Sequence, residues 1–142
     1  MPPTLKDDRG STSLFFLIVF LTLGALIGLA VDYSGMITAR QHTFAVAAEA
    51  ARAGGQQIDD ATAMGGTDIA VNTTAAAAAA SAYLAAAGVS GTATITTGGT
   101  ALEVDAHTTY SPRFLGAIGI GPIPIDGHAE TRLVQVIQGA ER

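Results

Sequence analysis

The chain has 142 residues, of which 49% are hydrophobic, a formal net charge of -5 and no cysteine. A chain of this length builds one small domain, and so large an apolar fraction indicates that part of it lies in lipid. Nucleic-acid binding is excluded, because phosphates require clustered basic side chains and Lys6 is the only lysine. The absence of cysteine excludes a disulfide framework and a thiolate metal site.

The first predicted element is an apolar helix over residues 14–31 (LFFLIVFLTLGALIGLAV), which carry no charge. As a helix they would be about 27 Å long, close to the thickness of the hydrocarbon core of a bilayer. Lys6, Arg9 and the terminal amine precede this segment, whereas Asp32 follows it directly. The positive-inside tendency therefore predicts a cytoplasmic N-terminus.

Three interpretations of this segment are open: a secretory signal, a permanent membrane anchor, and a pilin-type helix behind a short leader. A secretory signal would be cut after Gly28-Leu29-Ala30, where small residues occupy the positions that signal peptidase inspects. However, Asp7 and Asp8 make the preceding segment a poor match to a basic signal. A pilin-type leader would be cut just before the helix, which would be kept for assembly.

Beyond Asp32 the helical pattern continues to Ala53, and Gly54-Gly55 is expected to end it. In this outer half an apolar stripe is predicted at steps of three and four residues, formed by Met36, Phe44, Ala47, Ala48 and Ala51. Residues 56–69 are rich in Gly, Asp and Thr and are expected to form a loop.

A second helix is predicted from an N-cap at Asn72 or Thr73 through a run of alanines, with Gly88 as its end. Asn72-x-Thr74 also matches a glycosylation acceptor, but the N-cap explains the asparagine without an enzyme. Alternating apolar and polar residues then predict a β-hairpin around Gly98-Gly99. A third strand is predicted over residues 123–137, with a bulge or a strand end near 132–136.

These elements predict an α+β, pilin-like fold: a long N-terminal helix, a second alanine-rich helix and a small three-stranded antiparallel sheet. The apolar face of the sheet is expected to be covered by the alanine-rich helix surfaces. Between the second and third strands, residues 114–125 (FLGAIGIGPIPI) are more hydrophobic than a loop requires. We expect this segment to fold beneath the sheet, with a subunit contact as the alternative.

Two groups of side chains could carry a specific function. Asp105-x-His107 and Asp126-x-His128-x-Glu130 alternate along strands and would converge if those strands are neighbours, so His107 and His128 are candidate zinc ligands. The preferred interpretation is a solvated sheet face, and neither a cofactor, a catalytic residue nor a small-molecule substrate is predicted. Gly24-x-x-x-Gly28 has the form of a contact motif between membrane helices.

The N-terminal part of the chain resembles the TadE-like and TadG-like proteins of tight-adherence (Tad or Flp) pilus systems. The residues that carry the resemblance are Arg9-Gly10, the apolar segment 14–31, Val31-Asp32, Ala39-Arg40-Gln41 and the small-residue segment 47–55. The resemblance implies a minor pilin or pseudopilin, a structural component of pilus assembly and not an enzyme. It also implies contact with membrane lipid, with other pilins and with the assembly platform.

The resemblance further implies cleavage by a prepilin peptidase after Gly10, which would leave Ser11 as the new N-terminus. The expected organisation is a cytoplasmic leader over residues 1–10, a transmembrane helix continuing as an amphipathic helix over 11–55, and an extracytoplasmic α+β domain over 56–142. One departure concerns Phe15, which stands where mature pilins usually carry a glutamate. Phe15 cannot pair with the terminal amine of a neighbouring subunit, which favours a priming, tip or assembly component over a major fibre subunit.

The alternative function is a small α+β binding module, secreted or anchored, whose N-terminal segment is only an export signal. Release of a soluble protein that begins near Val31 would favour this alternative.

Overall fold

The structure is a computed structural model that describes residues 9–57, 68–69, 72–96, 98–133, 136–137 and 140–141. Its elements, in chain order, are α1 (Arg9–Gly55), β1 (Asp68–Ile69), α3 (Thr73–Ala86), β2 (Ser90–Ile95), β3 (Ala101–Tyr110), α4 (Phe114–Ala117), β4 (Ile123–Arg132), β5 (Val136–Ile137) and β6 (Ala140–Glu141). Most of the predicted loop over residues 56–69 lies outside the described residues.

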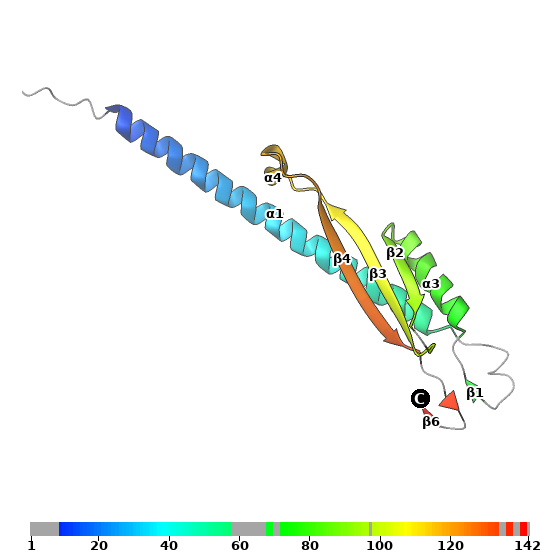
Figure 1. The fold of residues 1–142 in the computed structure, drawn as a ribbon. Coiled ribbons are helices and arrows are strands. Elements are labelled where there is room, and N and C mark those ends of the chain that lie inside the picture. Colours follow the sequence, from blue (N-terminus) through cyan, green and yellow to red (C-terminus); the bar gives the residue numbers. More distant parts are fainter. Residues whose placement is uncertain are drawn as a thin grey trace, which may run out of the picture.

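Helix α1 is 47 residues long and runs without interruption through both predicted halves. No proline occurs in it, and its glycines, Gly35 among them, do not interrupt it. Figure 1 shows that its N-terminal half projects alone, whereas its C-terminal half lies along the domain. The long N-terminal helix that the sequence predicts is therefore confirmed.

The main sheet has the strand order β2-β3-β4, and both pairs are antiparallel. Gly98 and Gly99 form the predicted turn between β2 and β3 with φ angles of 99° and 70°, which side chains disfavour. A second, small sheet has the order β1-β5-β6. The α+β class and the three-stranded antiparallel sheet are thus as predicted.

The third predicted strand has the expected strand end near residues 132–136 and does not continue to residue 137. β4 ends at Arg132, within the region where a bulge or a strand end was expected. The backbone N–H of Leu133 instead donates to the carbonyl oxygen of Thr100 at 2.8 Å. Val136–Ile137 is a separate strand, β5, which belongs to the small sheet.

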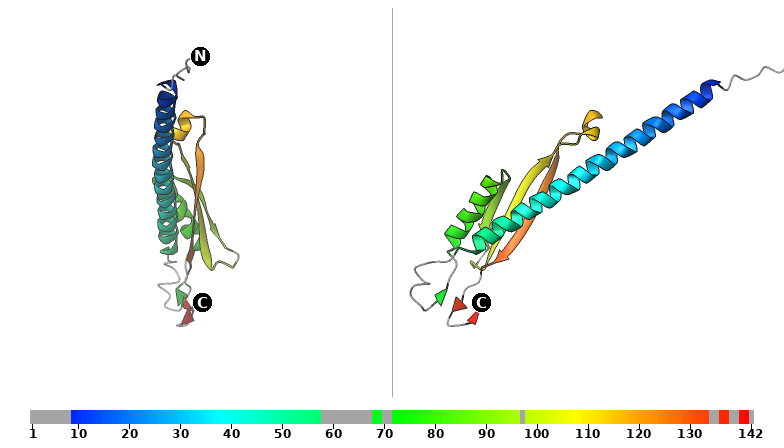
Figure 2. Two further views of the ribbon diagram at one scale, coloured as in Figure 1. Left: turned by 90° about the vertical axis from the view of Figure 1, so that its left-hand side faces the viewer. Right: turned by 180° about the vertical axis from the view of Figure 1, so that it is seen from behind.

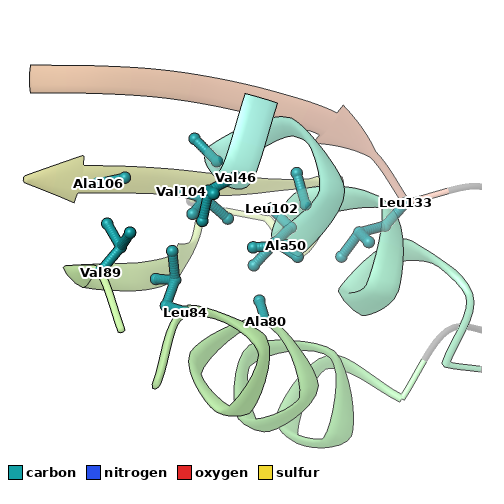
Figure 3. Packing of buried hydrophobic residues seen from close by; sticks show 11 residues of the cluster. Val46, Ala50, Ala80, Leu84, Val89, Leu102, Val104, Ala106 and Leu133 are labelled. Atoms are coloured by element: carbon teal, nitrogen blue, oxygen red, sulfur yellow. The ribbon is translucent and has the colours of Figure 1, made fainter. Parts of the chain in front are cut away.

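The core lies between the sheet on one side and α1 and α3 on the other. Figure 2 shows α1 and the sheet as adjacent layers, and Figure 3 shows the buried side chains pointing into the space between them. The cluster consists of Val46, Ala47, Ala50 and Ala51 of α1, Ala80 and Leu84 of α3, Leu102, Val104 and Ala106 of β3, and Val89 and Leu133. Alanine on the helices allows their backbones to approach the sheet closely, as the sequence predicts.

The predicted apolar stripe on α1 is wrong at two positions. Phe44 and Ala48 are exposed, whereas Thr43, Val46 and Ala50 are buried. The physical reason is the close approach of the helix backbone at Thr43 to β4, which favours the face with the smaller side chains. Phe44 lies outside this contact, with the guanidinium of Arg40 5.8 Å from the centre of its ring.

Ile125, at the end of the predicted segment 114–125, is buried in β4, but the connection that precedes β4 does not fold beneath the sheet, contrary to the expectation. It forms the short helix α4 and a turn, which lie beside α1 beyond the end of the sheet (Figure 1). No residue of α4 is buried. The apolar face of the sheet is already covered by α1 and α3, so this segment has no place beneath it.

Helix α3 begins where the sequence predicts. The side-chain oxygen of Asn72 accepts a hydrogen bond from the backbone N–H of Ala75 at 2.9 Å, and Gly88, with φ of 67°, follows the end of the helix.

Replacing Asn72 with alanine is expected to lower the free energy of unfolding by about 1 kcal/mol, because the N–H of Ala75 loses its partner. Urea unfolding of the detergent-solubilised chain measures this change. Ser81→Ala is the matched control, since Ser81 is exposed in the middle of α3 and alanine is the better helix former. Equal midpoints for the two variants would contradict a role for the cap.

Candidate functional site

The N-terminal half of α1 exposes a continuous apolar surface. Its large side chains, from Leu14 to Leu29, are roughly half to three-quarters exposed. Among the described residues, α1 is the one helix that is long and apolar enough to cross a membrane, with a mean hydropathy of 2.8 in its most apolar window. Signal sequences meet this criterion as well, but a core helix would be covered by protein, and this segment is not.

A buried carboxylate marks the point where this apolar segment ends. The side chain of Asp32 accepts hydrogen bonds from the backbone N–H groups of Arg113 at 2.7 Å, Phe114 at 2.9 Å and Leu115 at 2.6 Å. Asp32 is only 2% exposed, because α4 and the end of β3 cover it. We call this arrangement the Asp32 dock; it fixes the N-terminus of α4 to α1.

The electrostatics of the dock keep Asp32 ionised. Burial opposes the charged form, but the hydrogen bonds from the backbone N–H groups of Leu115, Arg113 and Phe114 outweigh it and lower the pKa of Asp32 below its usual 3.8. The hydroxyl of Tyr110, 3.5 Å from the carboxylate, acts in the same direction. At neutral pH the dock therefore holds an anion at the positive end of a short helix.

The two glycines of the predicted contact motif lie in different surroundings. A Cβ atom on Gly28 would be 2.9 Å from the Cβ atom of Phe114, so Phe114 packs directly against the α1 backbone there. A Cβ on Gly24 would meet nothing within 4 Å. Gly28 thus makes its close contact within this chain, and Gly24 faces open space.

Gly35 makes a second close approach near the dock, because the ring and the hydroxyl of Tyr110 lie against its backbone. The predicted processing residues, Gly10 and Ser11, are exposed in the first turn of α1. Sequence reasoning missed the dock because Asp32 and its partners are 81 to 83 residues apart and nothing in the sequence near Arg113 indicates a pairing.

Beside the dock, the space between α1 and β4 forms a groove of about 280 Å³. Its walls are Tyr33, Met36, Ile37 and Arg40 of α1 and residues 123–126 of β4. The groove is open to one side, and its lining combines apolar side chains with the polar groups of Tyr33, Arg40 and Asp126.

The histidine and carboxylate pairs come together across β3 and β4, as expected for neighbouring strands. His107 Nδ1 lies 2.8 Å from Asp126 Oδ1, and His128 Nδ1 lies 3.0 Å from Asp105 Oδ1. One ligand atom each from Glu103, Asp105 and His128 lie within 4.8 Å of one another, so these three could hold a metal ion. All of these side chains are on the outer face of the sheet and are at least 41% exposed, which is also the environment of a solvated face.

The stability of the chain is expected to fall as the pH rises above 6.5. The hydrogen bond to Asp105 raises the pKa of His128 above its usual 6.5; partial burial opposes this, and the charges of Asp105, Glu103 and Glu130 add to it. Because the pKa of His128 is higher in the folded state, protonated His128 stabilises the folded chain fully below pH 6.5. This contribution is lost as the pH rises through the pKa of His128 in the folded state. Urea unfolding at a series of pH values measures how the free energy of unfolding changes with pH.

His128→Gln should flatten this dependence, whereas His42→Gln, on the exposed surface of α1, should leave it unchanged. An unchanged slope in His128→Gln would show that another group is responsible.

Comparisons with known proteins agree with this architecture. Residues 10–57 match the Tad family, which is described as Flp pilus-assembly TadE/G-like. The match covers about a third of the chain and corresponds to α1 from its first turns to its end. No curated protein and no solved structure matches the chain. The resemblance seen in the sequence is confirmed by this match, which places residues 10–57 with the TadE/G-like family of Flp pilus-assembly proteins.

Proposed function

We propose that the protein is a minor-pilin or pseudopilin-type structural component in the assembly of an Flp-type pilus, anchored in the cytoplasmic membrane by α1. The match to the Tad family supports a role in Flp pilus assembly and contact with other pilus components. The observation that carries the finer proposal is the division of α1 into two halves. Its first half exposes large apolar side chains, and its second half packs one face, which includes Thr43, Val46 and Ala50, against the domain.

In this proposal the N-terminus is cytoplasmic and residues 56–142 form a domain outside the membrane. Residues 1–10 are a leader, which a prepilin peptidase removes after Gly10, and Ser11 begins the mature chain. The membrane lipid, other pilins and the assembly platform are the partners. The proposal assigns no catalytic residue, no cofactor and no small-molecule substrate.

The environment of Phe15 supports an assembly role in place of a repeated fibre subunit. Phe15 is 62% exposed, and its ring makes an edge-to-face contact with Phe16 at a centroid distance of 5.9 Å. The first turns of α1 can therefore offer a neighbour only apolar contacts at this position. A buried charge pair that fixes the axial register of one subunit against the next is not available at Phe15.

The alternative, a secreted binding module, has less support. Cleavage after Ala30 would remove Gly28, against which Phe114 packs, and would leave the ring of Phe114 without that surface. Retention of the helix keeps this contact.

The mass of the native protein, extracted from the membrane without proteolysis, tests the proposal. A chain that begins at Ser11 is the expected result. Gly10→Leu should block cleavage, because it places a bulky side chain at the residue before the proposed cut, whereas Gly24→Leu, in open space on the same helix, should be processed normally. A mature chain that begins at Val31 would overturn the proposal, and an uncut wild-type chain would overturn its processing step.

A further inference from the structure

We propose that α4 and the turn after it lie in the interfacial layer of the same bilayer that α1 spans, as a second lipid contact of the domain. We call residues 114–121 the foot. The inference rests on the proposed membrane anchoring of α1, and it adds a lipid-binding surface in a part of the chain that the Tad match does not cover.

The depth of the foot follows from its contact with α1. Phe114 packs on Gly28, which precedes the end of the apolar segment 14–31 by three residues. At 1.5 Å per residue, the contact is about 4.5 Å inside the end of that segment. If residues 14–31 cross the hydrocarbon core, Phe114 is held at its outer boundary.

The surface of the foot has the chemistry of this boundary. Ile118 is 75% exposed, Phe114 is 50% exposed and Ile120 is 43% exposed. No charged residue occurs between Arg113 and Asp126. In water this apolar surface would be unfavourable, whereas in the interfacial layer it is continuous with the apolar surface of α1. The side chain of Arg113, exposed at the edge of the foot, can reach lipid phosphates.

The backbone of the foot is also suited to lipid, where an N–H group without a partner is costly. The N–H groups of Arg113, Phe114 and Leu115 are bonded by Asp32. Those of Ile118 and Ile120 donate to the carbonyl oxygen of Leu115 at 3.2 and 3.0 Å. The N–H of Gly119 donates to the carbonyl oxygen of Gly116 at 3.1 Å. These internal bonds allow the irregular segment to leave water without exposing these donors.

A fluorescent label that responds to lipid-borne quenchers tests the proposal. The chain has no cysteine, so single cysteines can be labelled without background. We would place a nitrobenzoxadiazole label on Ile118→Cys and on Gly116→Cys in the foot. Leu23→Cys in the apolar half of α1 and Ser81→Cys on the exposed side of α3 are the references. The full chain is reconstituted in phosphatidylcholine and phosphatidylglycerol nanodiscs, with and without spin-labelled phospholipid.

The expected result is loss of emission at Leu23, Ile118 and Gly116 on addition of the spin-labelled lipid, and no loss at Ser81. Quenching of both foot labels by aqueous iodide, and not by lipid, would place the foot in water and overturn the inference. Protection from both quenchers would show that a second protein copy covers the foot and would equally overturn it.

The Leu23 label separates this inference from the proposed function. Quenching at Leu23 without quenching at either foot position means that the anchor exists and the foot does not touch lipid. Absence of quenching at Leu23 means that the anchoring itself is wrong, and the inference fails with it.

Discussion

Replacing Asp32 with alanine is expected to release α4 from α1 while the remainder of the domain stays folded. The substitution removes the acceptor of three backbone hydrogen bonds at the N-terminus of α4. The three N–H groups would then be buried without a partner, which costs free energy, unless the segment moves into water. No residue of α4 is buried, so the packing of Phe114 on Gly28 is the main contact that remains. Hydrogen exchange at the amides of residues 113–115 should become fast, with protection in β3 and β4 retained.

Glu49→Ala is the matched control for this experiment. Glu49 is a carboxylate on the same helix, but its side chain is 48% exposed and it pairs only loosely with Arg52, at 3.7 Å. Exchange at residues 113–115 should be unaffected in this variant. Slow exchange in Asp32→Ala as well would mean that packing of Phe114 on Gly28 is sufficient to hold α4.

The pH dependence of the same exchange gives a second check on the dock. Because the pKa of Asp32 is lowered in the folded state, its contribution is present above its usual 3.8 and is lost as the pH falls through the lower folded-state value. Protection at residues 113–115, corrected for intrinsic exchange rates, should therefore be constant near neutral pH and fall only in strong acid.

Replacing Gly127 with valine is expected to lower the free energy of unfolding by about 3 kcal/mol, because the added side chain has no room. A Cβ at this position would lie 2.9 Å from both the carbonyl carbon and the carbonyl oxygen of Thr43, which are backbone atoms that cannot turn aside. The helix would have to lift from β4, and contacts along the buried half of α1 would be lost. Urea unfolding of the solubilised chain measures the change.

Gly121→Val provides the control, since a Cβ there meets nothing within 4 Å and the residue is exposed. Its unfolding midpoint should remain close to that of the wild type. A similar small effect at Gly127 would show that α1 is not held as close to β4 as the structure describes.

The sequence was most informative where a single residue type has a local structural role. Asn72 and Gly88 marked the ends of α3, and Gly98-Gly99 marked the hairpin turn. The alternation of Leu102, Val104 and Ala106 identified the buried face of β3, since strand geometry fixes which side chains share a face.

Most features that depend on contacts between distant segments could not be predicted from the sequence. The apolar stripe on α1 was placed by hydrophobicity, which favoured Phe44, whereas the packed face was selected by the fit between Thr43 and Gly127. Asp32 showed no signal of its role, because its partners are main-chain groups, which every residue except proline carries. The paired histidines could be anticipated because only the register between two strands was needed.

The continuity of α1 has a mechanical consequence. The strands β3 and β4 run along its buried half, and no break separates that half from the apolar one (Figure 1). A pulling force along the helix axis, of the kind that extraction from a bilayer would apply, loads the contact between helix and sheet in shear. The side-chain contacts between α1 and the sheet then share the force. With a hinge at the membrane boundary, these contacts would instead break one after another. The helix can thus transmit tension from its apolar end to the domain without unfolding it.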